Sequence, residues 1–216
     1  MVAPRRPYLP AAGYDWALPF YDPFVKLLGG DRALRVLLDQ ADLRPGHRVL
    51  DVGCGTGTLV VMLKTRHPDV DVVGLDPDPK ALFSARRKAY GPKVSVQLDR
   101  GFSDELPYAE GSFDRVFSSF MFHHLEPEEK EKTVREIRRV LKPGATFHLL
   151  DFSGAGPPGE GVLARWLHVH HRLRDNFGGQ ILALLNQAGF ADAREVARGR
   201  LWFFARIAYY RARAGR

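Results

Sequence analysis

One nine-residue stretch, 49–57, constrains the fold more than any other part of the sequence. It begins with Val-Leu-Asp-Val, which predicts a buried strand, and continues with glycine at every second position, which predicts a tight turn. Residues 58–63 then predict the start of an apolar helix. A glycine turn between a strand and a helix lets a ligand approach the backbone and directs the N–H groups of the helix N-terminus toward it. The stretch therefore predicts a cofactor site.

The glycine spacing distinguishes between two classes of cofactor. A dinucleotide site requires the pattern G-x-G-x-x-G. Gly53 and Gly55 fit its first two places, but the third is Thr58, and the last glycine comes one residue early, at Gly57. This disfavours an NAD-dependent dehydrogenase. The pattern that starts at Asp51 instead resembles motif I of the class I S-adenosylmethionine-dependent methyltransferases, which implies S-adenosylmethionine as the cofactor.

Three further segments extend this resemblance over about residues 14–210. Asp76 follows the predicted second strand, 70–75, where a carboxylate can accept hydrogen bonds from the cofactor ribose; the alternative is that it only starts a turn. Residues 111–119 resemble strand 4 of the family, and the Leu-Lys-Pro-Gly before residues 145–150 resembles the turn before strand 5. The resemblance implies an α/β fold with a Rossmann-like, doubly wound seven-stranded sheet, mostly parallel, with an antiparallel strand 7.

One departure from the family pattern concerns adenine. Relatives have Gly-Asp-Ala where this chain has Gly101-Phe102-Ser103, so the acid that holds the adenine amino group is missing. Phe102 beside adenine, with backbone atoms making the polar contact, is one alternative; Asp99 or Asp104 as a substitute acid is another. The resemblance implies these cofactor-binding residues: Asp51, Gly53, Cys54, Gly55, Gly57, Asp76, Pro77, Phe102, Ser103 and Ser118.

The methyl acceptor is expected at the end of strand 4. Residues 118–124 should border the transferred methyl group, because strand carboxyl ends face the ligand crevice of such a sheet. His124 resembles a histidine that phosphobase methyltransferases use together with an N-terminal tyrosine, which makes it the candidate base; a structural role is the alternative. Predicted acceptor-binding residues are Tyr14, Tyr21, Phe122, His123 and Trp166, with Trp16 and Phe20 helping to shape an apolar pocket.

Two segments are expected to cover this site. Residues 1–30 form an N-terminal aromatic cap segment before a methyltransferase domain, 31–216, and an insertion near 152–178 forms a lid. His168 and His171 would share one face of the lid helix, 162–174. Because no carboxylate motif accompanies these histidines, no metal site is predicted.

The remaining patterns predict the other elements of the domain. Helices are expected over 31–43 (capped by Asp31), 79–90 (capped by Asp78), 127–141 and 181–188, and strands over 93–98, 193–197 and 201–210. Residues 201–210 are rich in aromatic side chains, which leaves a membrane-surface element as the alternative to a strand. A strand is favoured because its length suits ten residues and is too short for a membrane span. A basic tail begins at Arg211.

Composition limits the partners of the chain. Its 216 residues suffice for one α/β domain. The net charge of +7 is compatible with nucleic acid or an anionic membrane surface, but the basic residues are spread along the chain, so neither is favoured. No stretch approaches the ~20 apolar residues of a membrane span, and no signal peptide is visible. Cys54 is the only cysteine, which excludes a disulfide framework, so a cytoplasmic protein is expected.

These observations predict an S-adenosylmethionine-dependent methyltransferase that acts on a small-molecule acceptor. The chain most resembles the quinone-biosynthesis C-methyltransferases and related small-molecule enzymes. Methylation of a lipid head group or membrane quinone is one alternative, and a non-catalytic S-adenosylmethionine-binding protein is another. The sequence predicts neither the acceptor, nor the methylated atom, nor the oligomeric state.

Overall fold

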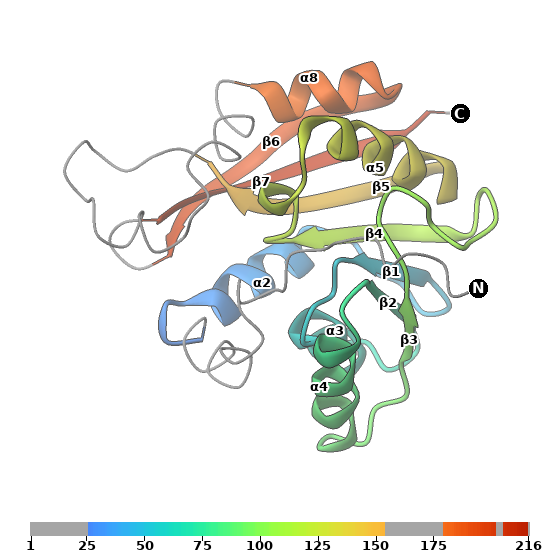
Figure 1. Ribbon diagram of the computed structural model, residues 1–216, viewed down its shortest axis with the longest axis vertical. Helices are drawn as coiled ribbons and strands as arrows, with labels where there is room; N and C mark the ends of the chain where they lie inside the picture. The colour runs from blue at the N-terminus through green and yellow to red at the C-terminus, as the bar shows by residue number, and fades with distance from the viewer. Residues whose placement is uncertain (1–25, 154–178, 202–204, 216) are drawn as a thin grey trace, which may run out of the picture.

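The computed structural model describes residues 26–153, 179–201 and 205–215, which form one seven-stranded sheet with helices on both faces (Figure 1). In chain order the elements are α2 (Gly30–Asp39), β1 (Arg48–Val52), α3 (Thr58–Arg66), β2 (Asp71–Asp76), α4 (Pro79–Tyr90), β3 (Gln97–Arg100), β4 (Phe113–Ser119), η2 (Phe122–His124), α5 (Pro127–Val140), β5 (Leu141–Phe152), α8 (Gln180–Gln187), β6 (Phe190–Leu201) and β7 (Ala205–Ala214).

The strand order is β3-β2-β1-β4-β5-β7-β6, and β7 is antiparallel to both of its neighbours. The pairs among the first five strands in this order are all parallel. This confirms the predicted doubly wound sheet with an antiparallel strand 7. The chain winds outward from β1 in both directions, so the crevice at the carboxyl ends of β1 and β4 is where such a sheet binds its ligand.

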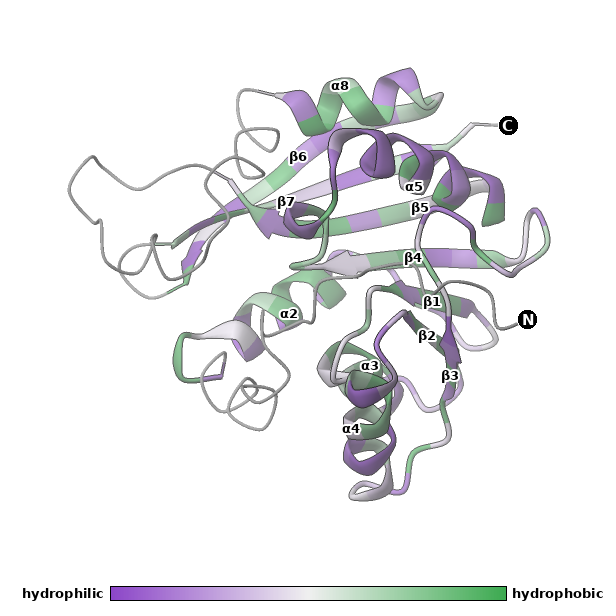
Figure 2. Cartoon of the chain, viewed as in Figure 1, coloured by the Kyte–Doolittle hydropathy of each residue, from purple (hydrophilic) through white to green (hydrophobic). Residues whose placement is uncertain are grey.

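Each face of the sheet carries its own apolar core, because successive strand residues point to opposite faces. Leu50 of β1 packs with Val134 and Ile137 of α5 on one face. Val49 packs on the other face with Leu37 of α2 and the residues of α3 and α4. Figure 2 shows hydrophilic colour along much of α5, as expected for a helix that buries only one side.

Three predicted helices are confirmed with nearly the predicted bounds. At the start of α4, Asp78 Oδ1 accepts a hydrogen bond from the Lys80 N–H at 2.8 Å, as its capping role requires. A capping box between Glu126 and Glu129 begins α5. Gly189 follows the C-terminal end of α8, as expected of a helix stop.

Two elements near the amino-terminal half differ from the prediction. Asp31 does not cap α2: the N-cap is Gly29, at φ 89°, and Asp31 lies within the first turn. The helix also ends at Asp39 rather than at residue 43. β3 begins at Gln97 instead of Lys93, because Lys93 has a left-handed backbone (φ 56°) and pairing with β2 starts only at Gln97.

The predicted bounds of the last two strands were wrong. Leu201 ends β6 and is the register partner of Ala205, which begins β7. β6 is therefore longer than 193–197, and β7 runs to Ala214, so Arg211 belongs to a strand rather than a tail. The apolar run 201–210 contains no glycine or proline to mark the turn, and only strand pairing shows where the chain reverses.

Several predicted features lie outside the described residues. They include most of the cap segment and of the lid, with Tyr14, Trp16, Phe20, Tyr21, Trp166, His168 and His171. No helix in the described part of the chain is long and apolar enough to cross a membrane.

Candidate cofactor and acceptor site

The glycine loop after β1 has the backbone geometry that only glycine adopts readily. Gly53, Gly55 and Gly57 have φ values of 73°, 52° and 78°, all in the left-handed region. The N–H groups of Gly53 and Cys54 both donate to the Leu75 carbonyl, at 2.8 and 3.0 Å. The loop is thereby tied to the carboxyl end of β2, and it ends in Gly57, the N-cap of α3.

Close packing is a second reason for glycine in the loop. A Cβ atom added to Gly53 would lie 2.3 Å from Cγ of Met121, which follows β4. One added to Gly57 would lie 2.6 Å from the Cβ of Ala85 in α4. The loop backbone therefore fits tightly between the end of β4 and the second helix.

Asp76 lies at the carboxyl end of β2, against this loop, and only 8% of it is exposed. Its Oδ2 accepts from the Gly55 N–H at 2.8 Å and its Oδ1 from the Asp78 N–H at 2.9 Å. Burial raises the pKa of Asp76 to about 6, and the two backbone N–H groups oppose that rise. The carboxylate predicted to bind the ribose is therefore held in place by the cofactor loop itself.

Asp51 is buried at the end of β1, 1% exposed, and neither carboxylate oxygen has a hydrogen-bond partner among the described residues. Burial, followed by the negative charge of Asp76, raises its pKa to about 8. A buried carboxylate without a partner is costly unless a cation or a donor reaches it. S-adenosylmethionine fits this requirement because its methionine part carries an ammonium group.

Other predicted cofactor residues have side chains engaged within the protein. Ser118 is fully buried, and its Oγ donates to the Val52 carbonyl at 2.9 Å, linking β4 to β1. Ser103 Oγ lies 2.8 Å from Thr133 Oγ1 of α5. Burial raises the pKa of the Cys54 thiol well above its usual value. These residues support the loop, so only their backbone atoms remain for direct contact.

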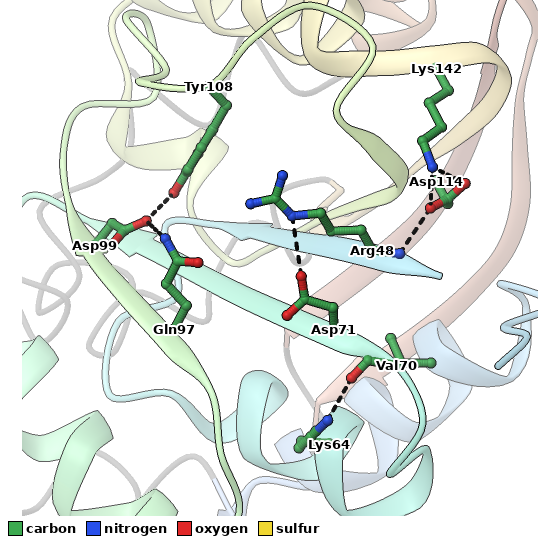
Figure 3. A network of polar contacts seen from close by, with 9 residues as sticks. All are labelled: Arg48, Lys64, Val70, Asp71, Gln97, Asp99, Tyr108, Asp114 and Lys142. Atoms are coloured by element: carbon green, nitrogen blue, oxygen red, sulfur yellow. Dashed lines mark hydrogen bonds and ion pairs between the residues drawn. The ribbon is translucent and has the colours of Figure 1, made fainter. Parts of the chain in front are cut away.

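Asp99, an alternative to the missing adenine acid, belongs to a polar network away from the glycine loop (Figure 3). Its Oδ2 accepts from Tyr108 Oη at 3.0 Å and from Gln97 Nε2 at 2.7 Å. These residues line an open cavity of about 570 Å³ together with Arg48 and Arg100. Asp99 is thus already shared between two donors. Phe102 and Asp104, both partly buried, stay the nearer alternatives.

The chain turns sharply where β4 ends. Phe120 has φ 53°, a strained conformation for a bulky residue, of the kind that costs about 1–3 kcal/mol and often lies at functional sites. Its N–H donates to the Leu150 carbonyl of β5 at 2.9 Å. The turn leads directly into η2, whose Phe122 is fully buried in the core, 6.0 Å from the Phe147 ring.

η2 places two histidines at the carboxyl ends of β4 and β5. His123 is buried, and its Nδ1 lies 2.8 Å from Oδ1 of Asp151, a fully buried residue near the end of β5. His124 is partly exposed, and its ring centroid lies 4.0 Å from that of His123. The sequence indicated both histidines but not the Asp151 partner; an acid at the end of a strand beside the crevice was the available signal.

The fold and this loop define an α/β protein that holds a cofactor at the carboxyl ends of its strands. The family model described as "Methyltransferase domain" matches residues 49–144. The demethylmenaquinone methyltransferase of Thermus thermophilus is 36% identical over 167 residues, which cover 76% of this chain and 74% of that protein. The chain belongs to the S-adenosylmethionine-dependent methyltransferases. This confirms, for the family, the predicted enzyme class, cofactor and type of small-molecule acceptor.

Other similar proteins differ in length and chemistry. The uncharacterized methyltransferase sll0829 of Synechocystis is 35% identical over 140 residues, and the match spans 64% of this chain and 63% of that protein. The solved structure of the [4+2]-cyclase SpnF has a TM-score of 0.71 and 22% identity, covering 86% of this chain and 80% of that one. At that identity the likeness shows the fold alone, and a fold does not by itself define a reaction.

Proposed function

We propose that this chain transfers a methyl group from S-adenosylmethionine to a quinone-type or related aromatic small molecule, bound at the carboxyl ends of β4 and β5. The observation that carries methyl transfer is Asp51, a buried carboxylate with no partner in the described part of the chain, beside the glycine loop. The aromatic acceptor is supported by the likeness to demethylmenaquinone methyltransferases from two organisms.

Three groups of this chain would hold the cofactor. Asp51 would pair with the methionine ammonium group, the glycine loop would lie against the methionine part, and Asp76 would accept from the ribose hydroxyls. S-adenosylmethionine supplies a methyl group on a positively charged sulfur, which is a good leaving group. The protein therefore has mainly to orient the two reactants and exclude water.

The described residues also offer a base for an acceptor that must lose a proton. Asp151 bonds to His123 Nδ1, which favours the tautomer with the proton on Nδ1 and leaves Nε2 able to accept a proton. Among the described residues, Nε2 has no hydrogen-bond partner. We assign the base role to His123, positioned by Asp151, and keep His124 as the second candidate because the two rings are adjacent.

The test combines cofactor binding with turnover. Isothermal titration should show that the full-length protein binds S-adenosylmethionine, and that Asp51→Asn weakens binding more than tenfold. Turnover is then measured against a panel of demethylated quinones and catechols. Binding without turnover of any acceptor would favour a non-catalytic S-adenosylmethionine-binding protein; tight NAD binding without S-adenosylmethionine binding would refute the proposal.

His123→Gln and His124→Gln form a matched pair for the base. We expect the first to lower kcat about 100-fold or more and the second to lower it much less, with cofactor affinity unchanged in both. The opposite order would return the role to His124. The cytoplasmic location, and the choice between a soluble acceptor and a membrane quinone, stay predictions.

A further inference from the structure

Two arginines lie directly opposite each other at the end of the β6–β7 hairpin. Arg200 of β6 is the register partner of Arg206 of β7, and both residues are exposed. Register partners in an antiparallel pair project from the same face, with Cβ atoms about 5 Å apart. Like charges in this arrangement repel each other, so the pair weakens the hairpin unless an anion lies between them.

Neither guanidinium is neutralised within the described part of the chain. Neither Arg200 nor Arg206 forms a side-chain hydrogen bond or an ion pair with another described residue. The other two arginines of β6 differ in this respect. Arg194 pairs with Asp192 at 2.9 Å, and Arg198 pairs with Glu195. The strand therefore balances the charges of two arginines and leaves the pair at its end unbalanced.

The pair extends the sheet face that carries His123 and Asp151. Asp151 is the register partner of Ala208, and Arg206 precedes Ala208 by two residues, so both arginines share the face of Asp151. Two residues of strand span about 7 Å. The Ser153 N–H donates to the Arg206 carbonyl at 2.9 Å, which places Arg206 just beyond the carboxyl end of β5.

We propose that Arg200 and Arg206 form an anion subsite that binds a phosphate group at the acceptor end of the sheet. This inference rests on the proposed function, because that function places the acceptor there. Two guanidinium groups match the charge of a phosphate monoester dianion, whereas a carboxylate would balance only one of them. The phosphate belongs either to a soluble acceptor or to a lipid head group, and both sources present the same chemistry.

The experiment uses Arg200→Gln, Arg206→Gln and the double variant of the full chain. Arg213→Gln is the matched control, since Arg213 is exposed on the same strand but on the opposite face and its replacement removes the same charge. One arm titrates inorganic phosphate at constant ionic strength. The other sediments the protein with phosphatidylglycerol vesicles or with neutral phosphatidylcholine vesicles.

We expect each single variant to weaken phosphate binding about tenfold, the loss of one charge-assisted contact, while Arg213→Gln changes it less than twofold. Phosphate should also raise the unfolding temperature of the native protein but not of the double variant. Retention on phosphatidylglycerol vesicles that only the double variant loses assigns the phosphate to a lipid; phosphate binding without retention assigns it to a soluble acceptor.

The proposal is overturned if the native protein binds neither probe, or if Arg213→Gln loses as much affinity as the double variant. Titration of S-adenosylmethionine into the same samples separates this result from the proposed function. A protein that binds S-adenosylmethionine but no anion refutes only the subsite. A protein that binds phosphate but no S-adenosylmethionine refutes the proposed function.

Discussion

Asp151 accepts two hydrogen bonds from the same residue, His123: one from its backbone N–H at 3.1 Å and one from its ring Nδ1 at 2.8 Å. The N–H of Phe152 adds a third at 2.7 Å. A fully buried carboxylate with three such contacts fixes both the position of η2 on β5 and the orientation of the imidazole ring. Asp151 is thus a positioning residue for His123.

Replacing Asp151 with Asn should change the chemistry more than cofactor binding. The amide can donate to Nδ1 and so favour the tautomer in which Nε2 carries the proton, which removes the base. We expect kcat to fall about 100-fold or more, with the affinity for S-adenosylmethionine within threefold of the native value. The measurement is steady-state kinetics over pH 5–9. An unchanged kcat with an unchanged pH profile would assign Asp151 a purely structural role.

Cofactor binding at pH 7 should release a proton from Asp51. Its pKa of about 8 means that the carboxyl group is mostly protonated in the free protein, whereas pairing with an ammonium group requires the carboxylate. Titrations in buffers of different ionisation enthalpy should therefore show close to one proton released. Asp51→Asn should abolish the release. Binding enthalpies that are independent of the buffer would contradict this account.

The same group should make the cofactor-free protein less stable as the pH rises. The folded pKa of Asp51 lies above the unfolded value of 3.8, so the folded state binds more protons between about pH 4 and pH 8. Its stability contribution is therefore present below pH 4 and is lost as the pH rises through 8. Urea unfolding should show that Asp51→Asn stabilises the free protein at pH 8 but not at pH 4.

Gly53→Ala and Gly46→Ala separate backbone strain from a steric clash. Both glycines have positive φ, 73° and 79°, but a Cβ at Gly46 would meet nothing within 4 Å, whereas one at Gly53 would overlap Met121. We expect Gly46→Ala to cost about 1 kcal/mol of unfolding free energy and Gly53→Ala about 2–4 kcal/mol. Only Gly53→Ala should also weaken cofactor binding. Equal costs in urea unfolding would mean that Met121 moves aside freely.

His148 should make the protein sensitive to acid. It is buried, and its Nδ1 has no hydrogen-bond partner among the described residues. Burial, and then the positive charges of Arg115 and Arg211, lower its pKa to about 3. The unfolded state, with a pKa near 6.5, binds more protons between pH 6.5 and pH 3, so stability falls as the pH drops through this range.

His148→Phe should remove this acid sensitivity. Phenylalanine keeps a ring to pack against Phe117, whose centroid lies 5.2 Å from that of His148, although the contact with Thr146 Oγ1 is lost. Between pH 7 and pH 4.5 the native protein should lose about 2 to 3 kcal/mol more unfolding free energy than the variant. Parallel losses in the two proteins, measured by urea unfolding, would show that His148 does not titrate in this way.

Local patterns in the sequence determined much of the cofactor side. The strand, the glycine turn and Asp76 follow from residue types that act on their own backbone or on the next element, so spacing alone predicts them. The capping by Asp78 is equally local, since its partner, the Lys80 N–H, is two residues away. The missing adenine acid was visible for the same reason, because Gly101-Phe102-Ser103 departs from a local family pattern.

Tertiary structure alone decided the acceptor side. His123 and Asp151 are 28 residues apart, and they meet only because β4 and β5 pair in one particular register. Arg200 faces Arg206 because Leu201 pairs with Ala205, a turn position that the continuous apolar run concealed. Sequence periodicity shows which face of a strand a residue occupies. It does not show which residue of the neighbouring strand lies beside it, because that depends on how the strands pack together.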